Sequence, residues 1–192
     1  VKIHAENAKL IYKGSAGADG KREPYYTRAK MGVHATNYGA SARTVAAAIG
    51  VTVAEAEEFQ RIWFSAHPQI KSWHHAVMHS LQTTRSVSNK FGYRRIYFDR
   101  IESILPEALA WVPQSTVACT INRGLVNIER NLPAVQILLQ VHDSLLLQLP
   151  IAKADELRPQ ILEQLRIVIP YDDPLIIPVG LKVSERSWGD CA

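Results

Sequence analysis

The spacing of apolar residues predicts a chain that begins with helices. Residues 1–12 place apolar side chains at mixed helical spacing, and the glycines between 14 and 20 predict a loop after them. The proline-free stretch from Thr27 to Tyr38 predicts a helix that ends at Gly39. Three more helices are expected. The first covers 42–49, between the cap Ser41 and Gly50, and the second covers 53–66, after a Thr52–Glu55 capping box. The third starts at Pro68 and extends through Leu81.

The period of the apolar pattern changes in the middle of the chain. Residues 84–98 contain two short β-prone pieces around Asn89–Gly92, which predicts a hairpin. Residues 106–130 have a helical pattern. We expect a break or kink near Pro113, because proline has no backbone N–H to donate.

The last third of the chain alternates strand and helix signals. Apolar β-prone runs at 135–140 and 145–149 flank the sequence Val141-His142-Asp143-Ser144, which predicts two strands that meet at a His-Asp turn. Residues 153–168 predict an amphipathic helix, and residues 176–183 predict a closing strand. Helices followed by an antiparallel sheet with further helices indicate an α+β fold.

Charge is distributed unevenly along the chain, although the net charge of +4 over 192 residues is small. Residues 1–100 hold 15 Lys and Arg against 7 Asp and Glu, whereas residues 101–192 hold 7 against 11. The first half is therefore suited to polyanions, although a solvated basic face would have the same composition. With two cysteines and no apolar run of membrane-spanning length, a disulfide framework and a membrane protein are both disfavoured.

One group of candidate residues repeats every four positions on the predicted helix at 27–39. Lys30, His34 and Tyr38 share one helix face. Such a stripe is compatible with a partly buried helix face. It is also compatible with a nucleotide platform, in which the lysine contacts phosphate and the rings lie beside sugar and base.

A second group lies at the predicted His-Asp turn. Asp143 is flanked by apolar runs, where a carboxylate costs free energy unless it is hydrogen-bonded, exposed or bound to a cation. Either Asp143 only forms the turn, or it binds a hard cation such as Mg²⁺ while His142 and Gln140 contact an anionic substrate.

Together the two groups resemble family A DNA polymerases. TRAKMGVHATNYGAS resembles the fingers helix of that family, in which a lysine precedes a ring residue by four positions and Tyr-Gly by eight, here Lys30, His34 and Tyr38-Gly39. Five further segments resemble the family in the same order, namely VKIHAENA, RSVSNKFGYRRIYF, ALAWVPQSTVACTI, LLQVHDSLLLQLP and VGLKVSERSWGD.

The resemblance implies an α+β architecture that is part of a right-hand polymerase fold. Residues 1–86 would form the helical fingers subdomain, with the nucleotide-binding helix at about 27–39. Residues 87–192 would form the later part of the palm, an antiparallel sheet with flanking helices, with the catalytic hairpin at about 135–149.

The resemblance also implies roles for particular residues. Lys30 would contact the triphosphate, His34 would pack on the incoming sugar and base, and Tyr38 would stand at the template base. Asp143 would be the catalytic carboxylate and a ligand of two Mg²⁺ ions. The residues implied in primer and template binding are Gln114, Gln140, His142, Arg94 and Arg95.

Three departures from the family pattern shape these expectations. Tyr26 stands where the family has an arginine, so Arg28 or Arg22 is the candidate for that triphosphate contact. Ser144 follows Asp143 where the family usually has glutamate. No segment resembles the family's first palm motif or its thumb, so the second metal-binding carboxylate is expected outside this chain, as part of a larger or split polymerase.

The expected function is template-directed DNA synthesis, with primer-template DNA, deoxynucleoside triphosphates and the remainder of the polymerase as partners. His142-Asp143-Ser144 also occurs in single-subunit RNA polymerases, which are the first alternative. A non-catalytic nucleic-acid-binding piece is the second. His34 with Asn37-Tyr38-Gly39 resembles bacteriophage variants of the family, here with a His-Asp-Ser motif. We therefore expect a location in the cytoplasm of a bacterial or phage-infected cell.

Overall fold

The computed structural model describes residues 2–191 and confirms the expected α+β class, with helices and three two-stranded antiparallel sheets. The described chain divides into two compact units. Unit 1 comprises residues 2–87 and 95–111, and unit 2 comprises residues 88–94 and 112–191. Within residues 2–191, no helix is long and apolar enough to cross a membrane.

Unit 1 is helical, and its helices match the predicted ones closely. Its elements are α1 (Ile3–Tyr12), the short 3-10 helix η1 (Lys13–Ala16), α2 (Tyr25–Asn37), α3 (Ala42–Ile49), α4 (Val53–Ala66), α5 (Pro68–Thr84) and the first turns of α6 (Ile101–Asn131). The predicted hairpin is confirmed as β1 (Ser86–Ser88) paired with β2 (Arg94–Ile96).

The predicted helix ends of unit 1 are formed by the expected side chains. Ser41 Oγ accepts a hydrogen bond from the backbone N–H of Thr44 at 3.2 Å, which satisfies a free donor at the start of α3. Thr52 and Glu55 form the full capping box of α4. Gly50 ends α3 with a φ of 66°, a left-handed conformation that glycine adopts without steric cost.

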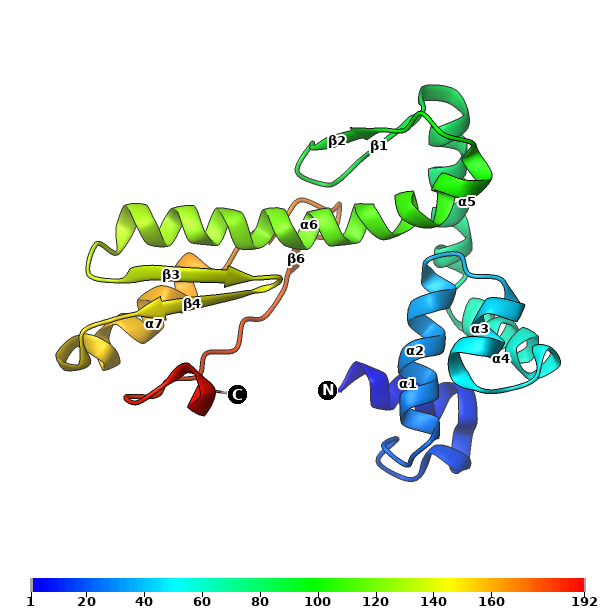
Figure 1. Ribbon diagram of the computed structural model, residues 1–192, viewed down its shortest axis with the longest axis horizontal. Helices are drawn as coiled ribbons and strands as arrows, with labels where there is room; N and C mark the ends of the chain where they lie inside the picture. Colours follow the sequence, from blue (N-terminus) through cyan, green and yellow to red (C-terminus); the bar gives the residue numbers. More distant parts are fainter. Residues whose placement is uncertain (1, 192) are drawn as a thin grey trace. The chain divides into compact units, whose positions relative to one another are not determined.

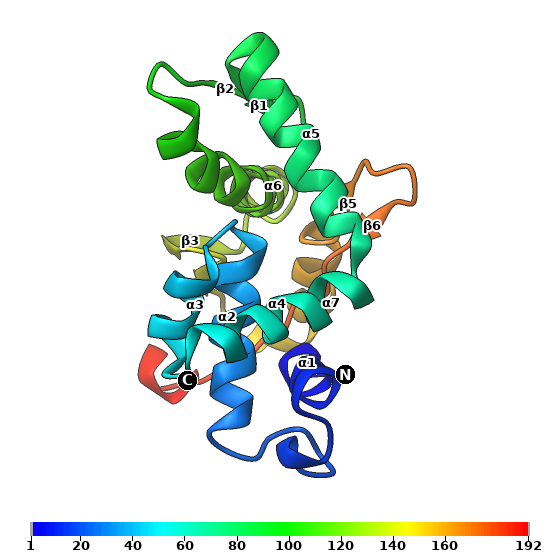
Figure 2. The same cartoon turned by 90° about the vertical axis from the view of Figure 1, so that its right-hand side faces the viewer.

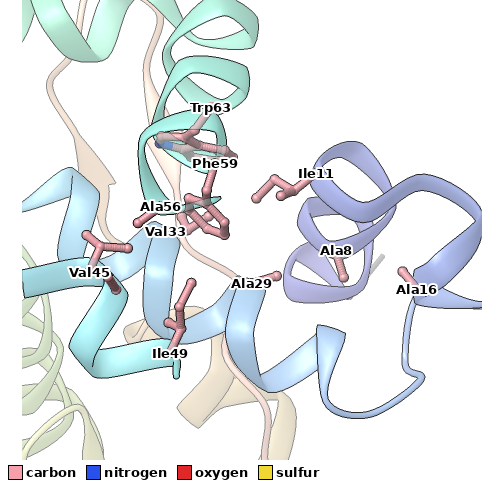
Figure 3. Close-up of a cluster of buried hydrophobic side chains, with 11 residues drawn as sticks. Ala8, Ile11, Ala16, Ala29, Val33, Val45, Ile49, Ala56, Phe59 and Trp63 are labelled. Atoms are coloured by element: carbon pink, nitrogen blue, oxygen red, sulfur yellow. The ribbon is translucent and has the colours of Figure 1, made fainter. Parts of the chain in front are cut away.

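The core of unit 1 lies between α1, α2, α3 and α4. In Figure 2, α2 has α1 on one side and α3 on the other. Figure 3 shows Phe59 and Trp63 of α4 projecting toward Ile11 of α1 and Val33 of α2. The buried face of α2 consists of small residues, which allows close helix packing, and these residues are Ala29, Gly32, Val33 and Thr36.

Two side chains from other helices hold the C-terminal end of α2. The indole N–H of Trp63 donates to Asn37 Oδ1 at 2.8 Å. His74 Nε2 lies 2.8 Å from the backbone carbonyl of Asn37, so this nitrogen carries the proton and donates. Burial lowers the pKa of His74, and its hydrogen bond to Asn37 only partly opposes that shift. Because Tyr38 directly follows Asn37, these contacts fix the point where Tyr38 leaves the helix.

Unit 2 is built around a long hairpin. Its elements after α6 are β3 (Gln136–Val141), β4 (Ser144–Gln148), the 3-10 helix η2 (Ile151–Lys153), α7 (Ala154–Gln164), β5 (Val168–Ile169), β6 (Leu175–Ile176) and the 3-10 helix η3 (Trp188–Cys191). In Figure 1, β3 and β4 run side by side, with α7 behind them. Apolar side chains of the hairpin pack on the residues that line the core, which are Ile128, Leu132, Val135, Leu157, Ile161 and Leu165.

Of the break or kink expected near Pro113, the break is wrong, because α6 runs as one helix from Ile101 to Asn131. Leu109 before Pro113 and Thr116 after it are both buried. A proline costs an internal helix about 3 kcal/mol. Burial of the helix on both sides of the proline exceeds that cost, because packing rather than local propensity supplies most helix stability.

The predicted helix and strand near the end of the chain are present, but their predicted bounds are wrong. The helix expected at 153–168 ends at Gln164, and Val168 lies in β5. The β-branched run before Pro170 favours extended backbone. The strand expected at 176–183 is limited to Leu175–Ile176, since the following segment contains Pro178, which cannot donate to a ladder.

Replacing Gly32 with alanine should destabilise unit 1. An added Cβ would lie 2.5 Å from Phe59 Cζ, closer than carbon atoms approach without displacement. We expect the free energy of unfolding to fall by about 1–3 kcal/mol, as for other overpacked cores. Urea denaturation followed by circular dichroism measures this. Met31→Ala on the exposed face of the same helix should change stability by about 0.5 kcal/mol or less, and an equal loss in both variants would contradict the packing argument.

His74 should make stability depend on pH. Its ordinary pKa is 6.5 and burial lowers the folded-state pKa, so the unfolded chain binds the proton more readily. The contribution of neutral His74 to the free energy of unfolding is fully present above about pH 6.5. It is lost as the pH falls through the lowered folded-state pKa. We expect His74→Gln, which keeps an N–H donor but does not titrate, to flatten this dependence in denaturation series from pH 8 to 5. Identical slopes in both proteins would refute the assignment.

Candidate nucleotide-binding helix and catalytic hairpin

The stripe predicted on α2 faces away from the core of unit 1. Lys30 and His34 are exposed, and Tyr38 is half-buried. The rings of His34 and Tyr38 meet edge to face, with centroids 4.5 Å apart and an interplanar angle of 70°. Lys30 and the paired rings of His34 and Tyr38 therefore lie along one side of the helix, because the opposite side packs against α4.

Arg28 lies on a different side of α2 from this stripe. Its Nε donates to the carbonyl of Ile49 at 3.0 Å and its Nη2 donates to the carbonyl of Gly50 at 3.1 Å. These carbonyls are at the C-terminal end of α3, where a cation also complements the helix dipole. The structure therefore gives Arg28 a capping contact that its sequence position did not indicate. Arg22, the other arginine considered, is exposed.

The predicted His-Asp turn joins β3 to β4. Val141 and Ser144 are the last cross-strand pair, so His142 and Asp143 form a two-residue turn. His142 has a φ of 52°, a left-handed conformation that tight hairpin turns require and that is uncommon for residues other than glycine. The Ser144 hydroxyl donates to the carbonyl of Val141 at 2.8 Å and closes the turn. Strained backbone of this kind is concentrated at functional sites.

The carboxylate of Asp143 is exposed at the tip of this hairpin. Carboxylate oxygen is the donor that Mg²⁺ prefers, and the ion usually binds one or two carboxylates together with phosphates and water. Within residues 2–191, no group of three His, Cys, Asp or Glu side chains could hold a metal ion. The chemistry of the Asp143 carboxylate is compatible with such an ion.

The two faces of the hairpin have different surroundings. Leu145 and Leu147 pack toward the core of unit 2. Leu139 and Val141 lie on the opposite face and are 45% and 36% exposed. Gln140 lies opposite Leu145, is exposed, and stands two residues before His142. Asp143 is thus carried by a hairpin that is anchored on one face and open on the other.

The remaining predicted residues are on the surface. Gln114 is exposed on α6, and Arg94 is exposed on β2. Arg95 is paired with Glu107, and its guanidinium lies 5.0 Å from the ring centre of Tyr97. The charge of Arg95 is therefore partly balanced within unit 1. Sequence reasoning did not predict that Trp63 and His74 contact Asn37, or that Glu107 pairs with Arg95. No spacing rule links residues that are so far apart in the chain.

Comparison with known proteins places these features in a family. The sequence model of DNA polymerase family A matches residues 2–190. A thermostable DNA polymerase I from Thermus filiformis is 30% identical, over 97% of this chain and 23% of its own length. DNA polymerase I from Deinococcus radiodurans is also 30% identical, over 80% of this chain and 17% of its own length. The chain thus spans about a quarter or less of these curated relatives.

A solved structure has the same fold. It is the polymerase domain of Pol1 from M. smegmatis in complex with DNA primer-template and dNTP. It matches with a TM-score of 0.76 and 21% identity, over 86% of this chain and 31% of that one. Because the family model covers nearly the whole chain, this protein belongs to DNA polymerase family A.

Proposed function

We propose that this chain takes part in template-directed DNA synthesis. In this reaction the 3′-oxygen of a primer forms a bond to the α-phosphorus of a deoxynucleoside triphosphate. The bond from that phosphorus to the bridging oxygen breaks, pyrophosphate leaves, and the hydroxyl proton passes to solvent or a base. The observation that carries the proposal is the exposed Asp143 at a strained two-residue turn, in a chain that matches the family over residues 2–190.

The α2 stripe would bind the incoming nucleotide. The exposed ammonium of Lys30 can contact the triphosphate and stabilise negative charge that develops during transfer. His34 and Tyr38 form a ring pair against which a sugar and base can pack. Arg28 is engaged at the end of α3, so Lys30 is the stronger candidate for the phosphate contact.

Asp143 would act as a magnesium ligand, with a second carboxylate supplied from outside this chain. Bound Mg²⁺ would supply Lewis-acid stabilisation of the reacting phosphate oxygens. The fixed turn holds Asp143 in place before substrate arrives, because Ser144 closes it by its own hydrogen bond and needs no metal to do so.

Polar residues near these positions would contact the primer and template. Gln140 and His142 lie on or beside the turn of Asp143, and Gln114 is exposed on α6 in the same unit. Arg94 on β2 would contact the phosphate backbone, which gives position without sequence information. Arg95 would do so only by exchanging its pairing with Glu107.

We further propose that residues 1–86 act as fingers and residues 87–192 as the later palm. The open face of the hairpin, with exposed Leu139 and Val141, would pack against further polymerase sequence, including a thumb and the first palm motif. The length of the relatives supports this, since the chain covers only 23% of the Thermus filiformis protein. The His-Asp-Ser turn and the ring at His34 support a bacteriophage variant.

A non-catalytic nucleic-acid-binding role is the second candidate. It is favoured by the absence, within residues 2–191, of a cluster of metal-binding side chains. Primer extension in magnesium separates the two, with the chain alone and with the missing polymerase segments added. Extension only with the added segments supports the polymerase role, whereas DNA binding without extension in both cases supports the second candidate.

Replacing Asp143 with alanine should abolish incorporation by the assembled polymerase. Loss of a metal ligand removes several kcal/mol of transition-state stabilisation, so we expect the rate to fall by about 10³-fold or more. Single-turnover primer extension measures the rate. Asp173→Ala, also an exposed carboxylate in unit 2, should extend normally. Turnover of the Asp143 variant near the normal rate would exclude the role.

Replacing Lys30 with alanine should chiefly weaken nucleotide use. We expect the apparent KM for the triphosphate to rise about tenfold, because one charge-assisted contact is lost, while DNA affinity stays within about twofold. Steady-state extension at varied nucleotide concentration measures this. Lys9→Ala on α1 is the matched control, since Lys9 pairs with Glu6 away from the α2 stripe. Unchanged KM in the Lys30 variant would refute the phosphate contact.

A further inference from the structure

The loop between β1 and β2 is held by a single buried side chain. Asn89 is 5% exposed, and its Oδ1 accepts hydrogen bonds from the backbone N–H groups of Phe91 and Tyr93, both at 3.0 Å. Its Nδ2 donates to Ser115 Oγ at 3.2 Å and to Cys119 Sγ at 3.3 Å, both on α6. One amide therefore shapes the loop and fastens it to the helix, and all five residues belong to unit 2.

The backbone of the loop is closed as well. The N–H of Asn89 donates to the carbonyl of Tyr93 at 2.9 Å, and the N–H of Gly92 donates to the carbonyl of Asn89 at 3.1 Å. Gly92 has a φ of 86°, which a residue with a side chain would rarely adopt. Backbone hydrogen bonds and the Asn89 side chain therefore close the same loop.

Two side chains of the loop, Lys90 and Phe91, make cation–ring contacts, whereas Tyr93 is exposed. The guanidinium of Arg123 lies 4.5 Å from the ring centre of Phe91, and Lys90 Nζ lies 5.0 Å from the ring centre of Tyr171. Tyr93, by contrast, is 62% exposed. Lys90 and Arg123 each lie over an aromatic ring, and the ring of Tyr93 is exposed to solvent.

The sequence of the loop and its flanking residues is basic. Residues 88–94 contain Lys90 and Arg94 and no acidic residue, and Arg123 adds a third positive charge beside the loop. An exposed ring among cations is the arrangement with which proteins bind unpaired nucleotides, because each base stacks on a ring while phosphates meet the cations. Bases in a duplex are stacked on each other and do not offer that face.

We propose that Tyr93 stacks on an unpaired base of single-stranded DNA, and that Asn89 is the residue that positions it. The inference rests on the proposed function, in which the chain handles primer-template DNA, and adds a site for its single-stranded part. Because Asn89 fixes the loop in advance, little conformational entropy is lost when the base binds.

Fluorescence anisotropy of the full chain tests this with labelled oligothymidine of about 12 nucleotides and a duplex of the same length. Tyr93→Ala should weaken oligothymidine binding about tenfold and duplex binding by less than about twofold. Tyr93→Phe keeps the ring and should bind nearly normally. Trp188→Ala removes another exposed aromatic side chain of unit 2 and should change neither affinity.

A double-mutant cycle tests the role of Asn89. Asn89→Ala should weaken oligothymidine binding like Tyr93→Ala but cause little further loss in the Tyr93→Ala background, because Asn89 acts through that ring. Asn89→Asp keeps the acceptor that shapes the loop and should recover part of the affinity. Additive losses would overturn the positioning role.

The remaining outcomes are distinct. Equal loss for oligothymidine and duplex in Tyr93→Ala, or no loss at all, would overturn the stacking site. Binding of duplex but not of oligothymidine by the unaltered chain would overturn this inference and leave the proposed function standing. Binding of neither would overturn this inference, whereas the proposed function is decided separately by primer extension with the missing polymerase segments added.

Discussion

The close approach of α2 to Phe59 is the constraint on which the candidate nucleotide site depends. Gly32 leaves no room for a side chain, and the small residues beside it let the helix lie against α4. A helix that packs so tightly on one face must turn its opposite face outward. Lys30 and His34 stand on that outward face, so packing in the core decides which side chains reach a ligand.

Two asparagines perform related tasks at positions where the chain leaves a helix or turns back. Asn37 receives hydrogen bonds from Trp63 and His74 at the end of α2, and Asn89 fastens a hairpin loop to α6. The Asn37 side-chain oxygen and backbone carbonyl both accept, whereas the Asn89 amide accepts through Oδ1 and donates through Nδ2. The half-buried Tyr38 directly follows Asn37, and the backbone N–H of the exposed Tyr93 donates to Asn89 Oδ1.

Local signals predicted much of the structure. The caps at Ser41 and Thr52 and the two hairpin turns are found where the sequence indicates them, because each depends on residues a few positions apart. The failures have different causes. Burial on both sides of Pro113 keeps α6 continuous, whereas the strand is limited to Leu175–Ile176 because Pro178 cannot donate to a ladder.

By itself, the sequence determined the caps of α3 and α4, the His-Asp turn and the resemblance to family A DNA polymerases, because each of these depends on a short run of residue types. Only the tertiary structure decided that Arg28 caps α3, that Arg95 pairs with Glu107 and that Asn89 locks its loop. The partners in these contacts lie 12 to 30 residues apart, and such pairs meet only when the chain is folded.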